Sequence, residues 1–354
     1  MEDEKLIAIE AVRKRPGMYV GDTDDGSGVL HLLLELVANA YDQYLTGRCT
    51  KVAIDIAADG TITVEDDGPG FSSGGSAELP PLHEMLTQLS RRPTVDGHRP
   101  HVHLGLGGMG LFVVNALSER FELRSIREGM ETAVAYARGT VVEAVTTIAT
   151  HKPDGTMVRF RPDPTIFTYP RVPRTALANR LEDLSFLAPR LTLSWKIEGD
   201  DLTAGGLAAR VGLGVPCELH DVAKHFGAYD TPNGPIDVEV AIAWCRSKWR
   251  ANRDPVIDSF VNMERTRNHG SHVDGLLDGI RAFFRGRKEK RMAGLVAAVS
   301  VVLTDVKFGE PDKSRLVTSE ARDPVASATK SALDEWNEKR PAVADEIRSR
   351  VSGS

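Results

Sequence analysis

The chain has 354 residues, of which 41% are hydrophobic and 27% are charged, and its formal net charge is −6 at pH 7. This length predicts two domains, and the composition is that of an ordinary water-soluble protein with enough apolar residues for two cores. The acidic balance gives no global attraction to nucleic acid, so any DNA contact would need a local basic surface.

Leucines and other apolar residues recur at helical spacing over residues 28–46, and Gly47 follows as a stop, so a helix is predicted there. Residues 51–56 and 61–64 alternate between apolar and polar side chains and predict a β-hairpin. This hairpin runs into Asp66-Asp67-Gly68-Pro69-Gly70, which cannot continue a strand.

An irregular segment follows from Ser72 to about Leu104, with one short helical stretch at 82–89. A connection of this length predicts a lid or a disordered segment. Gly105-Leu106-Gly107-Gly108-Met109-Gly110 then opens an apolar helix over residues 111–117.

Three further strands are expected in the first region, at residues 121–127, 134–137 and 156–160. The composition changes near residues 198–206, so we expect one domain over 1–200 and a second over 201–354. The second region predicts strands at 236–244 and 295–304, a helix at 273–285, and a polar helix over 325–351 that breaks at Pro341.

The cysteines, Cys49, Cys217 and Cys245, are isolated, and no Cys-x-x-Cys pair occurs. We therefore expect buried, unpaired thiols in a reducing cytosol, with neither a disulfide nor a zinc site. The acidic N-terminus has no apolar core of a signal peptide, and no run of about 18 uncharged apolar residues predicts a membrane span. A cytoplasmic protein is the expectation.

Glu35, Asn39 and Asp42 stand at i, i+4 and i+7 on the first predicted helix, which places them on one face. A solvated polar stripe is the plain interpretation. The strongly apolar neighbours favour a buried helix instead, on which an amide and carboxylate oxygens could hold Mg²⁺ beside phosphates.

The glycine-rich loop 105–110 could point backbone N–H groups at an anion, because it precedes a helix. A plain glycine turn is the alternative, and the chain contains neither a Walker A sequence nor a good Rossmann fingerprint. At the end of the hairpin, Asp66 could accept the exocyclic amine of adenine, with Gly70 allowing the base to approach, although an Asp- and Gly-rich turn explains the same residues.

The order of these elements resembles the GHKL ATPases, and the resemblance narrows to DNA gyrase B and its topoisomerase IV relative. The closest segments are Ala11-Val12-Arg13-Lys14-Arg15-Pro16-Gly17-Met18-Tyr19-Val20-Gly21-Asp22, Val113-Val114-Asn115-Ala116-Leu117-Ser118 and Gly155-Thr156-Met157-Val158-Arg159-Phe160. The similarity continues through Asn262, Gly270-Ser271-His272, Lys307-Phe308 and Lys313, and so covers nearly the whole chain.

The resemblance implies an α+β fold: a GHKL (Bergerat) ATP-binding domain of mixed sheet and helices, followed by a transducer domain like ribosomal protein S5. It implies that ATP and Mg²⁺ bind and that ATP closes a homodimer. By the same resemblance, Glu35 would be the general base, Asn39 the Mg²⁺ ligand, and Asp66 the adenine-binding carboxylate with Thr156 as its partner. Lys313 would contact the γ-phosphate. The phosphate cradle would be formed by Gly105, Leu106, Gly107, Gly108, Met109 and Gly110.

Several residues depart from the family pattern. Ala38 replaces an acidic residue, Pro69 replaces an arginine near the adenine end, and Pro311-Asp312-Lys313 retains only the lysine of the usual Gln-Thr-Lys. Proline lacks an N–H and Asp312 adds negative charge near phosphates, so γ-phosphate sensing is expected to be weakened. The N-terminal arm that straps the family's dimer is also expected to be mostly missing.

The sequence contains no metal-binding toprim domain and no breakage-reunion domain, so we expect that it cannot cut DNA by itself. Residues 198–201 superficially resemble a toprim acidic motif but fit a turn better. His98, His101 and His103 are close in sequence but lack an evident fourth metal ligand. The basic cluster at 285–291 is expected to be a solvated loop, with a DNA-facing patch inside a dimer clamp as the alternative.

Two functions stay open at this point. The first is an ATPase that opens and closes a dimer clamp related to type II topoisomerases, with DNA or a separate topoisomerase-type subunit as a partner. The second is a stand-alone module in which ATP gates dimerisation or partner binding with little or no hydrolysis. Phosphotransfer of the histidine-kinase type ranks last, because no phosphoacceptor histidine helix precedes the pocket.

Overall fold

The structure is a computed structural model, and it divides into two compact units, Met1–Ala204 and Gly205–Ser354. It describes residues 2–71, 82–88, 109–188, 190–197, 200–202, 207–212, 217–246, 254–262, 264–284, 292, 294–310 and 313–352. Of the expected lid, only residues 82–88 are described, and they contain the predicted short helix; the rest of the lid, the three lid histidines and the basic cluster at 285–291 lie outside the described residues. No helix in the described part of the chain is long and apolar enough to cross a membrane.

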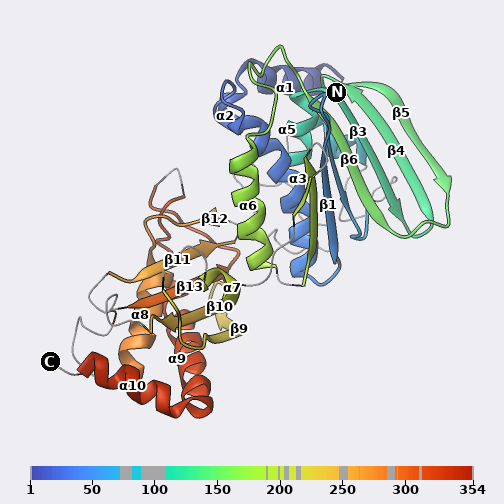
Figure 1. Ribbon diagram of the computed structural model, residues 1–354. Helices are drawn as coiled ribbons and strands as arrows, with labels where there is room; N and C mark the ends of the chain where they lie inside the picture. Colours follow the sequence, from blue (N-terminus) through green and yellow to red (C-terminus); the bar gives the residue numbers. More distant parts are fainter. Residues whose placement is uncertain are drawn as a thin grey trace. The chain divides into compact units, whose positions relative to one another are not determined.

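The first unit is a mixed eight-stranded sheet with helices on one face (Figure 1). Its strands are β1 (Lys51–Ile56), β2 (Ile62–Asp66), β3 (Ser118–Arg127), β4 (Met130–Ala137), β5 (Thr140–Ala149), β6 (Gly155–Pro162), β7 (Thr192–Ile197) and β8 (Asp200–Leu202). They lie in the order β5-β4-β3-β6-β2-β1-β7-β8, and every pair is antiparallel except β1 with β7.

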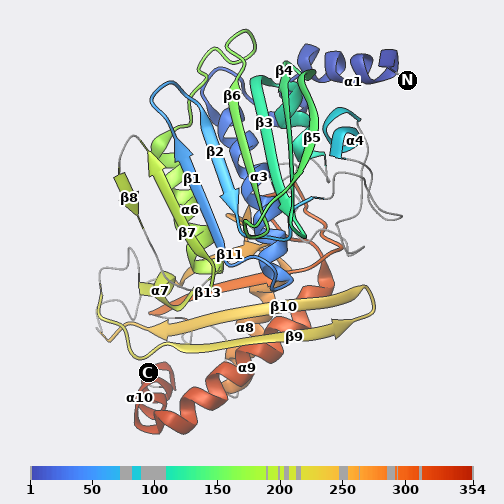
Figure 2. The ribbon, with the colours of Figure 1, turned by 90° about the vertical axis from the view of Figure 1, so that its right-hand side faces the viewer.

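The helices of this unit are α1 (Glu2–Lys14), α2 (Gly17–Val20), α3 (Ser27–Leu45), α4 (Leu82–Thr87), α5 (Gly110–Ala116) and α6 (Arg174–Leu187). Figure 2 shows α3 and α6 behind the sheet. The predicted hairpin is confirmed as β1 and β2, whose inward row of β-branched residues is buried. The predicted helix at 28–46 is confirmed as α3.

β5 is the terminal strand of the sheet, and all ten of its residues are exposed. Val141, Val142, Val145 and Ile148 are among the large apolar side chains on the surface. Its pairing with β4 shifts register twice, once opposite Ala133–Ala135 and once opposite Ala135–Tyr136. β5 therefore carries two bulges, which are typical of sheet edges.

The second unit is a five-stranded sheet in the order β12-β11-β13-β10-β9. Its elements are α7 (Leu207–Gly212), β9 (Ala223–Thr231), β10 (Gly234–Trp244), β11 (Val256–Val261), β12 (Glu264–Arg265), α8 (Ser271–Phe283), β13 (Leu295–Val302), α9 (Arg322–Lys339) and α10 (Pro341–Ser352). α8 and α9 pack together, and their apolar faces form one core with β10 and β13. The predicted break at Pro341 is confirmed, because Pro341 begins α10.

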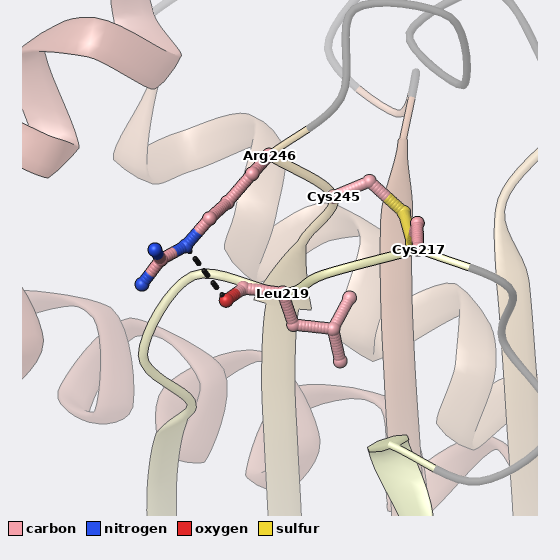
Figure 3. The surroundings of a disulfide bond; sticks show 4 residues. All are labelled: Cys217, Leu219, Cys245 and Arg246. Atoms are coloured by element: carbon pink, nitrogen blue, oxygen red, sulfur yellow. Dashed lines mark hydrogen bonds between the residues drawn. A yellow bond between two sulfur atoms is a disulfide. The ribbon is translucent and has the colours of Figure 1, made fainter.

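The expectation of three unpaired thiols is wrong for two of them. Cys217 and Cys245 form a disulfide, although 28 positions separate them in the sequence (Figure 3). The fold brings them together because residues 217–220 pair with the end of β10, through a bridge between Leu219 and Cys245. Spacing along the chain could not reveal this pairing. Cys49 is free and buried, as expected.

Gly270 gives a direct test of the second unit's packing. Its φ is +132°, and a Cβ at this position would lie 2.1 Å from the carbonyl oxygen of Leu316. We expect Gly270→Ala to lower stability by at least about 2 kcal/mol, which corresponds to a fall in apparent Tm of roughly 4–8 °C. Gly17→Ala is the control, since no atom of the described residues outside its own helix and chain neighbours lies within 4 Å of its added Cβ. An unchanged melting temperature for Gly270→Ala would contradict this packing.

Candidate active site

Glu35 lies in the middle of α3 and is buried, with 6% of its surface exposed. α5 begins directly against it, because a Cβ built on Gly110 would lie 2.5 Å from Glu35 Oε2. A side chain at this position would displace the carboxylate, so glycine lets α5 begin this close to Glu35 as it is placed here. The predicted general base and the end of the predicted phosphate loop are therefore neighbours.

His31 stands one turn before Glu35, and its Nε2 lies 3.3 Å from Glu35 Oε1. Both atoms are buried, and neither has a hydrogen-bond partner within the described residues. A buried polar atom without a partner costs about 1–3 kcal/mol, so Glu35 Oε1 is an unsatisfied acceptor that the fold alone does not explain. The predicted site residues did not include His31, although i, i+4 spacing places it beside Glu35.

The three polar residues expected on one face of α3 have different surroundings. Glu35 and Asp42 are buried, whereas Asn39 is exposed between buried Ala38 and Ala40. The burial of both carboxylates argues against a solvated stripe. Asn39 follows Glu35 by one helical turn, and its amide is open to a ligand approaching this face.

Asp66 ends β2, and β6 places Thr156 directly opposite it. The next strand, β3, places Ser125 beside Thr156. The structure thus brings Asp66 and Thr156 together, as the resemblance implies. Burial raises the pKa of Asp66 to about 6, a hydrogen bond from the Gly68 amide to Oδ1 at 2.9 Å opposes this shift, and neighbouring Asp67 adds to it.

Asp67 has the opposite environment. Burial alone would raise its pKa, but hydrogen bonds from the Thr50 hydroxyl and the amides of Thr50 and Lys51 outweigh burial and lower it. Asp67 therefore fixes the start of β1 to the end of β2. Of the two adjacent carboxylates, only Asp66 has an ionised form that the fold disfavours.

Gly70 adopts a left-handed backbone with φ +65°. A Cβ there would lie 2.3 Å from the carbonyl oxygen of Ile126, and the next amide, of Phe71, donates to Ser125 Oγ at 2.6 Å. Gly70 thus lets the chain after β2 cross the end of β3. The structure gives it this structural role; the approach of a base stays a prediction.

The phosphate loop is only partly described. Met109 and Gly110 lead into α5, whereas Gly105, Leu106, Gly107 and Gly108 lie outside the described residues. α5 itself is buried along its whole length. The cradle predicted for residues 105–110 therefore stays a prediction except where Gly110 meets Glu35.

Lys313 belongs to the second unit and has a left-handed backbone, with φ +56°. Its Nζ lies 3.7 Å from Glu264 Oε1. The hydroxyl of the neighbouring Ser314 donates to Glu310 Oε2. The backbone N–H of Asn268 donates to the backbone carbonyl oxygen of Ser314 at 2.8 Å. The lysine is thus presented on a hydrogen-bonded turn; the preceding Pro311 and Asp312 lie outside the described residues.

The fold and site define a GHKL-type ATPase domain joined to a second α/β domain. The family model described as histidine kinase-, DNA gyrase B-, and HSP90-like ATPase matches residues 24–166. The DNA gyrase B model matches residues 215–353. The chain belongs to the gyrase-B-like GHKL ATPases with a transducer domain, which confirms the predicted family and fold class.

Two relatives agree with this assignment. The chain is 31% identical to the DNA gyrase B of Caulobacter vibrioides and 32% identical to the mitochondrial DNA gyrase B of Arabidopsis thaliana, each over 98% of the chain. These alignments cover 47% and 51% of the relatives, so the chain spans about half their length.

Two solved structures have the same fold. The 43K ATPase domain of Thermus thermophilus gyrase B, solved with an aminocoumarin, superposes with a TM-score of 0.81 at 26% identity, covering 97% of this chain and 93% of that one. The topoisomerase IV ATP-binding domain of Francisella tularensis, solved with a small-molecule inhibitor, gives 0.75 at 26% identity, covering 97% and 96%.

The pKa values of Asp66 and Asp67 are shifted in opposite directions, so we expect their substitution to change the stability of the protein in opposite directions. The folded pKa of Asp66 is raised above its unfolded value, so stability falls as the pH rises from about 4 to about 6 and stays reduced above that. We expect Asp66→Asn to stabilise the nucleotide-free protein at pH 7.5 by up to about 2–3 kcal/mol, with a smaller gain at pH 5.

Asp67→Asn is the matched control. The folded pKa of Asp67 is lowered, so its stabilising contribution is present at neutral pH and is lost as the pH falls. It should therefore destabilise the protein at pH 7.5. Thermal or urea unfolding at pH 5 and 7.5 measures both variants, and a destabilised Asp66→Asn at pH 7.5 would contradict the burial assigned to Asp66.

Proposed function

We propose that this chain binds ATP with Mg²⁺ and hydrolyses it, as the ATPase and transducer module of an ATP-driven dimer clamp related to type II topoisomerases. The observation that carries the proposal is Glu35: a buried carboxylate whose Oε1 has no hydrogen-bond partner among the described residues, placed directly against the first residue of α5. We assign ATP binding to residues 1–200 and the transducer role to residues 201–354.

Nucleotide recognition is assigned to three groups of residues. Asp66, with Thr156 opposite it, accepts the exocyclic amine of adenine; the Asp66 pKa of about 6 leaves the carboxylate mostly ionised at pH 7.5. Residues 105–110 hold the phosphates through their backbone amides. Asn39, exposed one turn beyond Glu35, supplies an oxygen for Mg²⁺, which prefers a few protein oxygens together with phosphates and water.

The hydrolysis step is assigned to Glu35. Its Oε1 accepts a hydrogen bond from water, orients this water toward the γ-phosphorus and takes its proton as the new P–O bond forms. The bond from the γ-phosphorus to the β,γ-bridging oxygen breaks in the same step, so that ADP leaves and inorganic phosphate is formed. His31 Nε2 lies 3.3 Å from the same oxygen and so is close to the proton that Glu35 receives. Mg²⁺, when bound, would offset the charge on the phosphate oxygens. Lys313 of the second domain is assigned to the γ-phosphate, where a compact ammonium stabilises developing charge.

The partners follow from the same proposal. ATP favours a homodimer, and DNA or a separate topoisomerase-type subunit is the partner of the clamp. The residues assigned here bind and hydrolyse a nucleotide; none is assigned to DNA cleavage, so we propose that this chain does not cut DNA by itself. A cytoplasmic location accords with these partners.

A second candidate function is a nucleotide-gated binding module with little hydrolysis. It is favoured by the position of Lys313, whose ammonium lies 3.7 Å from the carboxylate of Glu264. That carboxylate competes with a phosphate for the same cation, and Asp312 precedes the lysine in the sequence.

Steady-state ATP hydrolysis tests the choice between these functions. We expect wild-type turnover to rise faster than linearly with protein concentration, and Glu35→Ala to lower it at least about 100-fold, because general-base catalysis contributes this much. Glu65→Ala, which removes an exposed carboxylate from β2, should leave turnover unchanged. ATP binding without turnover above Glu35→Ala would favour the binding module.

ATP-induced thermal stabilisation tests the adenine assignment. A ligand that binds only the folded state raises its stability, so Mg²⁺-ATP should raise the apparent Tm of the wild type and of Glu35→Ala. We expect no such rise for Asp66→Asn, even though its nucleotide-free Tm should be higher than that of the wild type. An unchanged ATP-induced shift in Asp66→Asn would exclude Asp66 as the adenine-binding carboxylate.

A further inference from the structure

Arg13 lies in the last turn of α1 and makes two hydrogen bonds to other parts of the first unit. One guanidinium nitrogen donates to the carbonyl oxygen of Ala116 at 2.8 Å, and the other donates to Asp163 Oδ2 at 2.6 Å. Ala116 is the last residue of α5, so its carbonyl belongs to the electronegative end of this helix. A cation there satisfies the carbonyl and interacts favourably with the helix dipole.

Asp163 fixes the same end of α5 from another direction. Its side chain is fully buried, and Oδ1 accepts hydrogen bonds from the amide and hydroxyl of Thr165 at 2.9 and 2.7 Å. Its own amide donates to the carbonyl oxygen of Leu117 at 3.1 Å. Arg138 donates to the same carboxylate at 3.0 Å, and within the described residues its side chain makes no hydrogen bond to α5.

α5 links this cluster to Glu35. It has seven residues, all buried, so it is about 10 Å long, or two turns. Its last carbonyl is held by Arg13, and its first residue, Gly110, leaves no room for a side chain beside Glu35 Oε2. A shift of the C-terminal end of α5 therefore moves the contact that defines the position of the carboxylate.

We propose that Arg13 is a positioning residue for the nucleotide site: α1 sets the place of α5 through the bond from Arg13 to Ala116, and α5 sets the place of Glu35. This inference rests on the proposed catalytic role of Glu35. It makes α1 part of the catalytic arrangement, although no residue of α1 is assigned to the nucleotide.

Arg138→Ala is the matched control for Arg13→Ala, because each removes one arginine from Asp163 and only Arg13 also binds Ala116. We expect Arg13→Ala to lower kcat about tenfold with KM for ATP changed less than about threefold, since a small misplacement of a catalytic group reduces the rate strongly. Arg138→Ala should keep kcat within about twofold of the wild type. Equal losses of kcat in the two variants, or a wild-type kcat in Arg13→Ala, would overturn the proposal.

Hydrogen exchange of the nucleotide-free protein gives a readout that does not need hydrolysis. Amides of residues 110–117 should exchange faster in Arg13→Ala and at the wild-type rate in Arg138→Ala, because only the first variant frees the end of α5. Unchanged exchange in Arg13→Ala would overturn the inference by itself. A wild type without ATP turnover would instead count against the proposed function and leave the exchange experiment to decide the role of Arg13.

Discussion

The contact between α3 and α5 is the constraint on which the rest of the first unit depends. A carboxylate is held inside the protein, with one oxygen against the backbone of a glycine and the other beside a histidine. Burial of a charge without full hydrogen bonding opposes folding, so the surrounding core has to offset it. The apolar residues of α3 and α5 do so, since most of the side chains on these two helices are buried.

The end of β2 also holds a partly buried carboxylate at the site, that of Asp66, next to one that stabilises the sheet. Asp66 ends β2 and Asp67 follows it, yet their side chains meet different partners. Asp67 meets three donors from the start of β1 and tightens the sheet, whereas Asp66 meets one amide and the open site. Of two consecutive aspartates, Asp67 therefore has a structural role and Asp66 is left for the site.

Periodicity was sufficient to predict α3, the first hairpin and α8, and Pro341 predicted the break between α9 and α10. It predicted neither β5, whose residues are exposed on both faces and so show no alternation of burial, nor the disulfide, which needs two distant segments to meet. In the site, the predicted neighbours Asp66 and Thr156 are confirmed as strand partners. The contacts of His31 and Arg13 depend on how the side chains of α1, α3 and α5 pack together. Helical spacing shows which residues share a face of one helix, but it does not show which other helix packs against that face.

The two bulges of β5 have a consequence for how copies of this molecule meet at high concentration. A long valine-rich edge that pairs with no other described strand is the kind of template along which sheets from two molecules join and then grow. A bulge interrupts the even spacing of those groups and increases the local twist, so an incoming strand can bond over only a few residues at a time. The irregular pairing with β4 therefore shortens the stretch of this edge over which a second molecule could form regular hydrogen bonds.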